Sequence, residues 1–135
     1  MTLTLDTSAL YAIINQGDPD HDRVRQARDA ERGPYLVPAG ILAEVTYMVE
    51  STLPLPALEG LLTDLETGAY ALDCGERDFS RIRYLVKRYA DLPLGFADGA
   101  VVACAERQGG RVATLDRRNF DVVARGEGSI TVLPE

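Results

Sequence analysis

Residues 92–120 read LPLGFADGAVVACAERQGGRVATLDRRNF, and the rest of the chain is organised around this stretch. The run FADGAVVACAERQ (96–108) is apolar on nearly every side, which predicts a helix buried all round rather than along one stripe. Gly109 and Gly110 follow, and glycine tolerates the left-handed turn that ends a helix. Residues 112–115 (VATL) then form a short apolar run typical of a central parallel strand.

Each of these two predicted elements carries one carboxylate near an end. Asp98 is the single acid in the first half of the helix, and Asp116 directly follows the strand. A buried carboxylate is costly unless it is paired or binds a metal, so both acids call for a partner elsewhere in the chain.

Length and composition predict a single globular domain, residues 1–135, with 46% hydrophobic and 26% charged residues. The sequence contains no apolar run of about twenty residues, so it predicts no membrane span. The N-terminus lacks a basic leader, and the two cysteines, Cys74 and Cys104, form no CxxC pair. Cys104 falls in the apolar helix, where a small reduced core residue is expected, so we expect a cytoplasmic protein.

The net charge of −7 argues against an electrostatic grip on nucleic acid. Two observations leave that class open. All basic residues except Lys87 are arginines, which bind phosphate as a fork, and acids clustered around a metal would reverse the local sign of charge.

Short strand-like runs alternate with helical patterns along the whole chain, which predicts an α/β fold with a central, mostly parallel sheet and helices on both faces. The expected strands are residues 3–5, 35–37, 69–72, 112–115 and 130–133, and the expected helices are residues 7–14, 20–32, 39–52, 57–66, 79–89 and 96–108.

Asp6 and Asp116 both end predicted strands. Ligands of open parallel sheets bind at the carboxyl ends of the strands, so these two acids are expected on one edge. An equally simple interpretation is that each caps a helix or stabilises a turn.

Glu44 falls among the apolar positions of the helix predicted over residues 39–52, so we expect it on a buried helix face. Its alternative is a structural salt bridge. Asp98 lies in the first turn of its helix, where the helix dipole alone stabilises an acid by about 0.3–1 kcal/mol.

Taken together, Asp6, Glu44, Asp98 and Asp116 predict a cluster of oxygen ligands. His21 is the only histidine, so no Cys/His set for zinc exists. Carboxylates suit Mg²⁺ or Mn²⁺, which lower the pKa of bound water and stabilise a phosphate under attack.

Four segments carry a resemblance to a known family: LDTSAL around Asp6, LAEV around Glu44, DLPLGFADGAVVACAE around Asp98 and VATLDRRNFDVV around Asp116. Together, and in this order, they resemble the PIN domain family, and more closely the VapC-type toxins of VapBC toxin–antitoxin pairs. The resemblance implies a Mg²⁺- or Mn²⁺-dependent endoribonuclease that acts on RNA such as tRNA or rRNA, with the four acids as catalytic and metal-binding residues.

The resemblance also implies supporting residues and partners. Thr7, Ser8 and Thr114 match hydroxyl positions that orient carboxylates or water, and Arg117 and Arg118 are candidates to bind the RNA backbone or to form a solvated pair. A homodimer and a small VapB-like antitoxin are the expected protein partners. Asp91 is a fifth candidate acid for the site, but its position before Leu-Pro fits a cap or turn residue equally well.

Other classes fit the sequence less well. A receiver-like phosphoacceptor domain needs a lysine at a strand end, but Lys87 lies in a predicted helix, and a haloacid-dehalogenase-type phosphatase needs an acid where Ser8 stands. No GxGxxG follows a strand, which disfavours a Rossmann cofactor site. A non-catalytic protein-binding module of PIN-like fold is the remaining alternative, and metal binding discriminates it from the enzyme.

Overall fold

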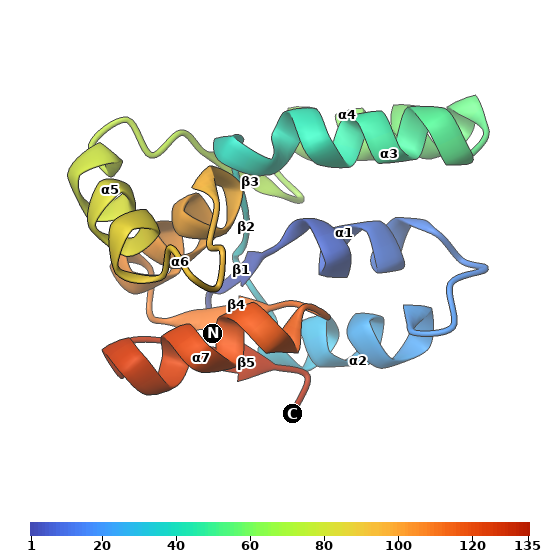
Figure 1. Ribbon diagram of the computed structural model, residues 1–135. Helices are drawn as coiled ribbons and strands as arrows, with labels where there is room; N and C mark the ends of the chain where they lie inside the picture. Colours follow the sequence, from blue (N-terminus) through green and yellow to red (C-terminus); the bar gives the residue numbers. More distant parts are fainter.

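The computed structural model describes all residues, 1–135, as a central sheet flanked by helices (Figure 1). The strands are β1 (Leu3–Leu5), β2 (Tyr35–Pro38), β3 (Ala71–Asp73), β4 (Arg111–Ala113) and β5 (Thr131–Leu133). The helices are α1 (Thr7–Ile14), α2 (His21–Glu31), α3 (Leu42–Thr52), α4 (Leu55–Thr67), α5 (Phe79–Arg88), α6 (Phe96–Arg107) and α7 (Arg117–Glu127), and a 3₁₀ helix, η1 (Ala39–Ile41), directly precedes α3.

The sheet has the order β3-β2-β1-β4-β5, and every pair of neighbouring strands is parallel. The predicted fold class is therefore confirmed. The chain builds outward from β1 to β3 on one side and then crosses back to β4 and β5 on the other. The strand order thus reverses between β1 and β4, the place where open parallel sheets bind their ligands.

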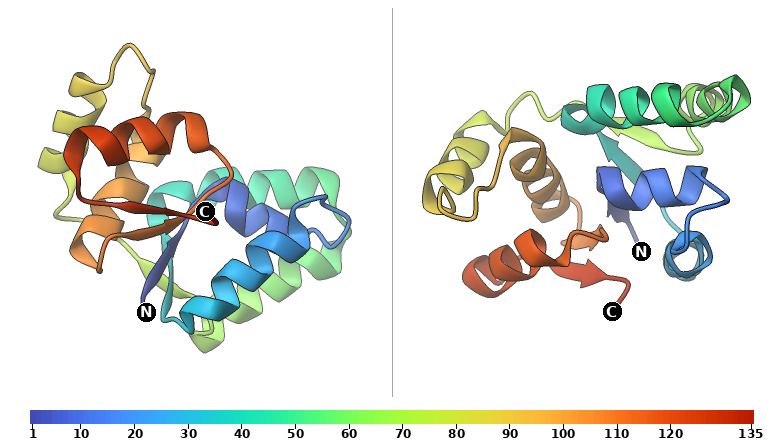
Figure 2. Two further views of the ribbon diagram at one scale, coloured as in Figure 1. Left: turned by 90° about the horizontal axis from the view of Figure 1, so that it is seen from below. Right: turned by 45° about the vertical axis from the view of Figure 1, so that its right-hand side comes forward.

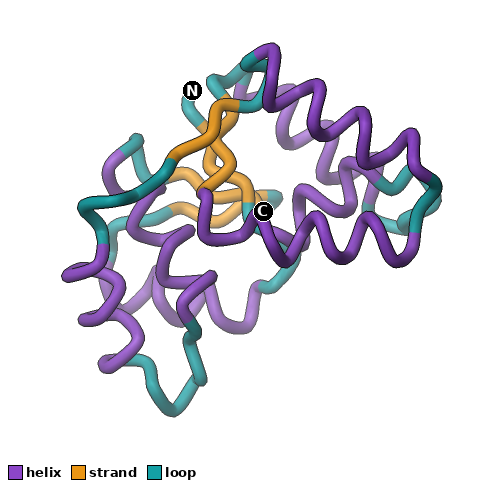
Figure 3. Tube along the Cα trace, turned by 90° about the horizontal axis from the view of Figure 1, so that it is seen from above, coloured by secondary structure: helices purple, strands orange, loops and turns teal.

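The helices form two groups, one on each side of the sheet. Helices α1 to α4 lie together, and α5 to α7 lie on the opposite side, with the strands between them (Figures 2 and 3). Most of the buried apolar residues form one continuous core that includes residues of β1, β2, β4 and β5 and of both groups of helices.

Helix α6 is buried all round, as its sequence predicts, because every residue from Gly99 to Ala105 is buried. The chain then turns through Gly109 and Gly110, whose φ values are +102° and +83°. An added Cβ at Gly110 would lie 2.7 Å from the Ser129 carbonyl oxygen, so this turn requires glycine for space as well as for conformation.

Several predicted boundaries need correction. Helix α4 begins before Pro56 rather than after it, because proline is tolerated in the first turn of a helix. The predicted helix over residues 39–52 divides into η1 and α3, and the third strand ends at Asp73 rather than Leu72. Helix α7 was not predicted, although Gly128 closes it with a left-handed φ of +67°.

None of the helices has the length and apolar character needed to cross a membrane.

Candidate active site

A cavity of about 360 Å³ opens at the carboxyl edge of the sheet. The seven residues that line it include all four predicted acids and no lysine, arginine or histidine: Asp6, Thr7, Ser8, Glu44, Met48, Asp98 and Asp116. Four segments far apart in the sequence therefore contribute carboxylates to the lining of one cavity. The cavity lies at the switch point of the sheet, where Asp6 follows β1 and Asp116 lies beyond the end of β4.

Each acid lies at the N-terminal end of a different helix. Asp6 and Asp116 are the N-cap residues of α1 and α7, and Glu44 and Asp98 lie in the first turns of α3 and α6. The positive ends of these helix dipoles face the cavity and stabilise negative charge by about 0.3–1 kcal/mol each. The fold thus offsets part of the repulsion among four carboxylates.

Asp6 is the most buried of the four, with 5% of its surface exposed. Its Oδ2 accepts hydrogen bonds from Thr114 Oγ1 at 2.7 Å and from Ser8 Oγ at 3.2 Å. Burial nevertheless raises the pKa of Asp6 to about 6, and the charge of Asp98 adds to the rise against the hydroxyl hydrogen bonds. As an N-cap, Asp6 makes no capping hydrogen bond, so capping does not explain its presence.

The hydroxyls of Ser8 and Thr114 tie the two central strand ends together. They lie 3.2 Å apart, and they accept hydrogen bonds from the backbone N–H groups of Leu115 and Asp116 respectively, each at 2.9 Å. This network fixes the loop after β4 against the start of α1. Two of the three hydroxyls predicted to orient carboxylates or water, those of Ser8 and Thr114, therefore contact the Asp6 carboxylate directly.

Thr7 is different from the other two hydroxyl residues. It is buried in the cavity wall, and its Oγ1 is the only buried side-chain polar atom of the protein without a hydrogen-bond partner. Buried hydroxyls are almost always paired with protein or ordered water. The Thr7 hydroxyl therefore has hydrogen-bonding capacity that no other group of the protein uses.

Asp98 is half-buried, and its Oδ2 accepts a hydrogen bond from Asn119 Nδ2 at 3.2 Å. Burial raises the pKa of Asp98, and the charges of Asp116 and Glu44 raise it further, while the Asn119 hydrogen bond opposes them. Asn119 also donates its backbone N–H to Asp116 Oδ1 at 3.5 Å. One residue of the first turn of α7 thus contacts two of the four acids.

Glu44 does not lie on a buried helix face, and this prediction was wrong. Its side chain is exposed, because the buried positions of the segment are Ile41, Val45 and Val49, spaced four residues apart. Glu44 flanks this stripe and borders the cavity instead. It forms no ion pair with any arginine, so the salt-bridge alternative fails as well.

The donor chemistry of the cavity fits a hard divalent cation, since its side chains offer four carboxylates and two hydroxyls, no nitrogen, and a single thioether sulfur, that of Met48. In this structure no three acidic, histidine or cysteine side chains converge closely enough to hold one ion. The side chains point instead to their own hydrogen-bond donors, as Asp6 does to Thr114 and Asp98 to Asn119.

A family model described as PIN domain matches residues 3–126, which is most of the chain. The chain belongs to the PIN domain family. This PIN domain is 34% identical to Ribonuclease VapC26 of Mycobacterium tuberculosis over 135 residues, covering 98% of this chain and 100% of the relative.

Two crystal structures share the PIN fold of this chain. VapC20 of Mycobacterium tuberculosis, described as a toxin that cleaves the sarcin–ricin loop, has a TM-score of 0.77 at 17% identity, covering 90% of this chain and 95% of VapC20. FitAcB of Neisseria gonorrhoeae has a TM-score of 0.63 at 21% identity, covering 98% and 97% of the two chains. At these identities the likeness shows the fold.

The two arginines that follow Asp116 have different surroundings in this PIN domain. Arg117 pairs with Asp121 at 3.2 Å and donates to the Pro134 carbonyl oxygen at 2.5 Å, so its guanidinium is engaged by the C-terminal segment. Arg118 is exposed and forms no ion pair, which leaves it the freer of the two candidates for RNA contact.

Sequence reasoning missed Asn119 because the helix that carries it was not predicted. The available signal was an N-cap acid, Asp116, followed by apolar Phe120 and Val123 at helical spacing and by Gly128. Asp91, in contrast, is exposed and does not line the cavity of the PIN domain.

Proposed function

We propose that this PIN domain is a Mg²⁺- or Mn²⁺-dependent endoribonuclease and the toxin of a type II toxin–antitoxin pair. The observation that carries the proposal is the cavity itself. Four carboxylates from four separate segments line it, and no cationic side chain among its lining residues neutralises them. Such an arrangement is costly for folding alone, and a bound divalent cation offsets that cost.

Asp6, Glu44, Asp98 and Asp116 are the residues that would hold the metal. When bound, a divalent ion supplies a bound water of lowered pKa and positive charge opposite a phosphate. Thr114 and Ser8 hold the Asp6 carboxylate in place, and Asn119 holds that of Asp98, so these carboxylates are oriented before any ligand enters. Arg118, exposed beyond Asp116, is proposed to contact the RNA backbone.

The relatives support RNA as the substrate. The relative that matches 98% of the chain at 34% identity is named a ribonuclease, and VapC20, which shares the fold, is described as cleaving the sarcin–ricin loop. The VapC names of both relatives support a VapB-like antitoxin as the cognate inhibitor of this protein. We further propose that the protein forms a homodimer.

Cleavage of total cellular RNA tests the proposed function. Antitoxin-free wild type is compared with Asp98→Asn and, as a matched exposed acid, Asp91→Asn, each with Mn²⁺ and with EDTA. We expect discrete fragments from wild type and Asp91→Asn, and none from Asp98→Asn or in EDTA. Full activity of a folded Asp98→Asn variant, or activity that survives EDTA, would overturn the metal site. If a folded wild type cuts no RNA and binds no Mn²⁺, the non-catalytic binding module is the correct description.

A further inference from the structure

Helix α5 is the only helix of the protein that carries basic residues and no acid. Two of its cations are neutralised by neighbouring helices, since Arg81 pairs with Glu106 and Glu127, and Arg88 also pairs with Glu127. The other two, Arg83 and Lys87, are exposed and form no ion pair. In a chain of net charge −7, this helix therefore presents a local positive surface.

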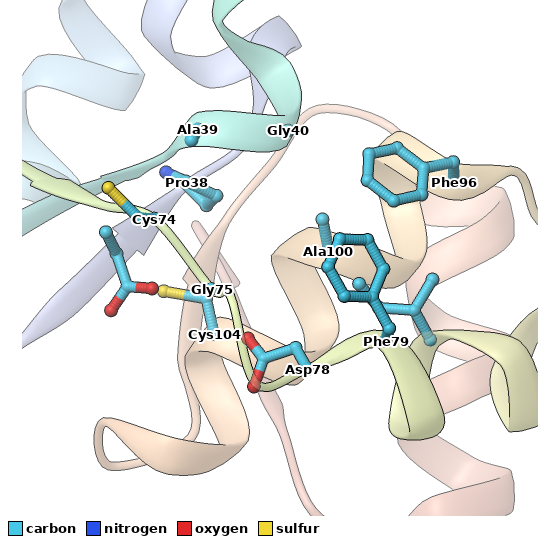
Figure 4. Close-up of a pocket in the computed structure, with 12 residues that line it drawn as sticks. Pro38, Ala39, Gly40, Cys74, Gly75, Asp78, Phe79, Phe96, Ala100 and Cys104 are labelled. Atoms are coloured by element: carbon cyan, nitrogen blue, oxygen red, sulfur yellow. The ribbon is translucent and has the colours of Figure 1, made fainter.

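An exposed phenylalanine continues the same row. Phe79, Arg83 and Lys87 are spaced four residues apart, so they follow one another along one side of α5. Phe79 is 63% exposed and stacks on Phe96, which is 51% exposed, with ring centroids 6.4 Å apart and a tilt of 24°. Both rings line a small hollow of about 30 Å³, whose lining residues are drawn in Figure 4. The third phenylalanine, Phe120, is fully buried, so only these two lie outside the core.

The stacked pair lines a hollow separate from the four-carboxylate cavity, but the segments that carry the rings adjoin segments that carry two of the acids. Phe96 begins α6 two residues before Asp98, a step of about 3 Å along the helix axis. On its other side, the Phe96 ring lies 3.3 Å from the position of a Cβ added to Gly40, one helical turn before Glu44. Phe96 thus begins the helix that carries Asp98 and lies against the 3₁₀ helix that precedes Glu44, and the row of cations extends from Phe79 along α5.

We propose that Phe79 and Phe96 form a stacking platform for bases of single-stranded RNA, and that Arg83 and Lys87 bind the phosphates of the strand that leads to the cavity. The proposal rests on the proposed ribonuclease function. Exposed aromatic rings next to unpaired cations are the combination that binds single strands, because every base has a flat face and every linkage a negative charge. We therefore expect this surface to bind segments of RNA whose bases are unpaired.

The same features disfavour a second copy of the chain as the occupant of this surface. A two-fold contact centred on the rings would bring the unpaired Arg83 and Lys87 of both copies into one interface, with no acid on α5 to compensate them. A phosphate backbone has the complementary charge.

Binding of a fluorescein-labelled single-stranded RNA of about twelve nucleotides tests the surface directly. Anisotropy is measured in EDTA, so that the RNA stays intact. We expect Phe79→Ala/Phe96→Ala and Arg83→Ala/Lys87→Ala each to weaken binding about tenfold or more. Leu62→Ala, an exposed apolar residue of α4, and Arg25→Ala on α2 are the matched controls and should bind like wild type. Circular dichroism confirms that each variant is folded.

Cleavage with Mn²⁺, measured in parallel, separates this proposal from the proposed function. A ring variant that binds and cleaves RNA with the wild-type KM overturns the platform and leaves the ribonuclease intact. If wild type binds RNA in a way that depends on the rings but does not cleave it, the platform is supported and the proposed catalysis is refuted. A ring variant that binds RNA normally but turns a wild-type dimer into a monomer in sedimentation assigns the rings to an interface between copies, and also overturns the platform.

Discussion

The surroundings of Asp6 destabilise its ionised form, so this residue is not placed where it would stabilise the metal-free protein most. Two hydroxyls donate to its carboxylate, yet burial and the neighbouring Asp98 raise its pKa to about 6. The ionised form therefore destabilises the metal-free fold at neutral pH. Its position was predictable, since an acid follows a buried strand in the sequence. Its pKa was not, because the hydroxyl of Thr114 and the charge of Asp98 come from segments about a hundred residues away.

Replacement of Asp6 by asparagine should stabilise the metal-free protein at neutral pH. A folded pKa of about 6 against 3.8 means that the folded state binds more protons between these values, so wild-type stability falls as pH rises through them. In EDTA we expect Asp6→Asn to be more stable than wild type by about 2–3 kcal/mol at about pH 7.5, and similar to it near pH 4. Urea denaturation at both pH values measures this. A difference independent of pH would contradict the assigned pKa, and exposed Asp91→Asn is the control.

Asn119 is expected to act by positioning Asp98. Asn119→Ala removes the amide that donates to Asp98 Oδ2, and loss of such an outer hydrogen bond typically costs about 10–100-fold in activity or metal affinity. We expect kcat for RNA cleavage and Mn²⁺ affinity both to fall by about tenfold, with little loss of stability. Arg125→Ala, exposed on the same helix, should match wild type in both assays. Wild-type kcat in Asn119→Ala would refute the role.

Contacts between helices determine which acids line the cavity. The sequence predicts these contacts less well than it predicts the helices themselves. Glu44 reaches the cavity because η1 and α6 approach closely at Gly40, where an added Cβ would lie 2.7 Å from Ala100 Cβ. The hydrophobic pattern identified the helix but placed Glu44 in its buried stripe, since periodicity alone does not show where a neighbouring helix leaves a cavity. Helix α7 escaped prediction for a related reason: its first turn is polar, and Asn119 in that turn binds Asp98 of another helix.

Gly40→Ala should therefore impair both folding and cleavage. The added methyl group forces η1 and α6 apart, which we expect to cost about 1–3 kcal/mol and to lower kcat, because Glu44 and Asp98 separate. The matched control is Gly60→Ala in α4, where an added Cβ meets nothing within 4 Å. That variant should gain about 0.5–1 kcal/mol from helix propensity and cleave like wild type. Denaturation and cleavage kinetics of both variants provide the measurement, and equal behaviour would contradict the close approach.

Across the whole molecule, the candidate metal-binding acids and the arginine-bound glutamates that stabilise the fold lie at opposite ends of the same two helices, α6 and α7. The acids lie at the helix N-termini, whereas Glu106 and Glu127 lie at the C-terminal ends of α6 and α7 and both pair with Arg81 of α5. Asp98 and Glu106 are about 12 Å apart along the axis of α6. The parallel fold and the edge that carries the acids were predictable from alternating patterns. The arginine network was not, because it joins charged residues of three helices that hydrophobic periodicity does not relate to one another.

Arg81→Met should destabilise the protein without changing its catalysis. It leaves Glu106 and Glu127 without their shared guanidinium, which we expect to cost about 1–3 kcal/mol, the lower end applying because Arg81 is partly exposed. Although burial opposes it, hydrogen bonds from Tyr89 and Arg81 lower the pKa of Glu127. The stabilisation that the Arg81–Glu127 pair provides is therefore present above about pH 4.5 and is lost as pH falls further. Urea denaturation against pH measures it, with the exposed pair variant Arg23→Met expected to lose less than about 0.5 kcal/mol. An altered kcat in folded Arg81→Met would contradict the separation.

The most direct test of the four-carboxylate site is calorimetric titration of Mn²⁺ into antitoxin-free protein at about pH 7.5. We expect saturable binding by wild type and by Asp91→Ala, binding weakened at least about tenfold in Asp6→Ala, and a loss of affinity as pH falls below the Asp6 pKa of about 6. Absence of Mn²⁺ binding by folded wild type, or equal binding by Asp6→Ala, would show that these acids do not form a metal site.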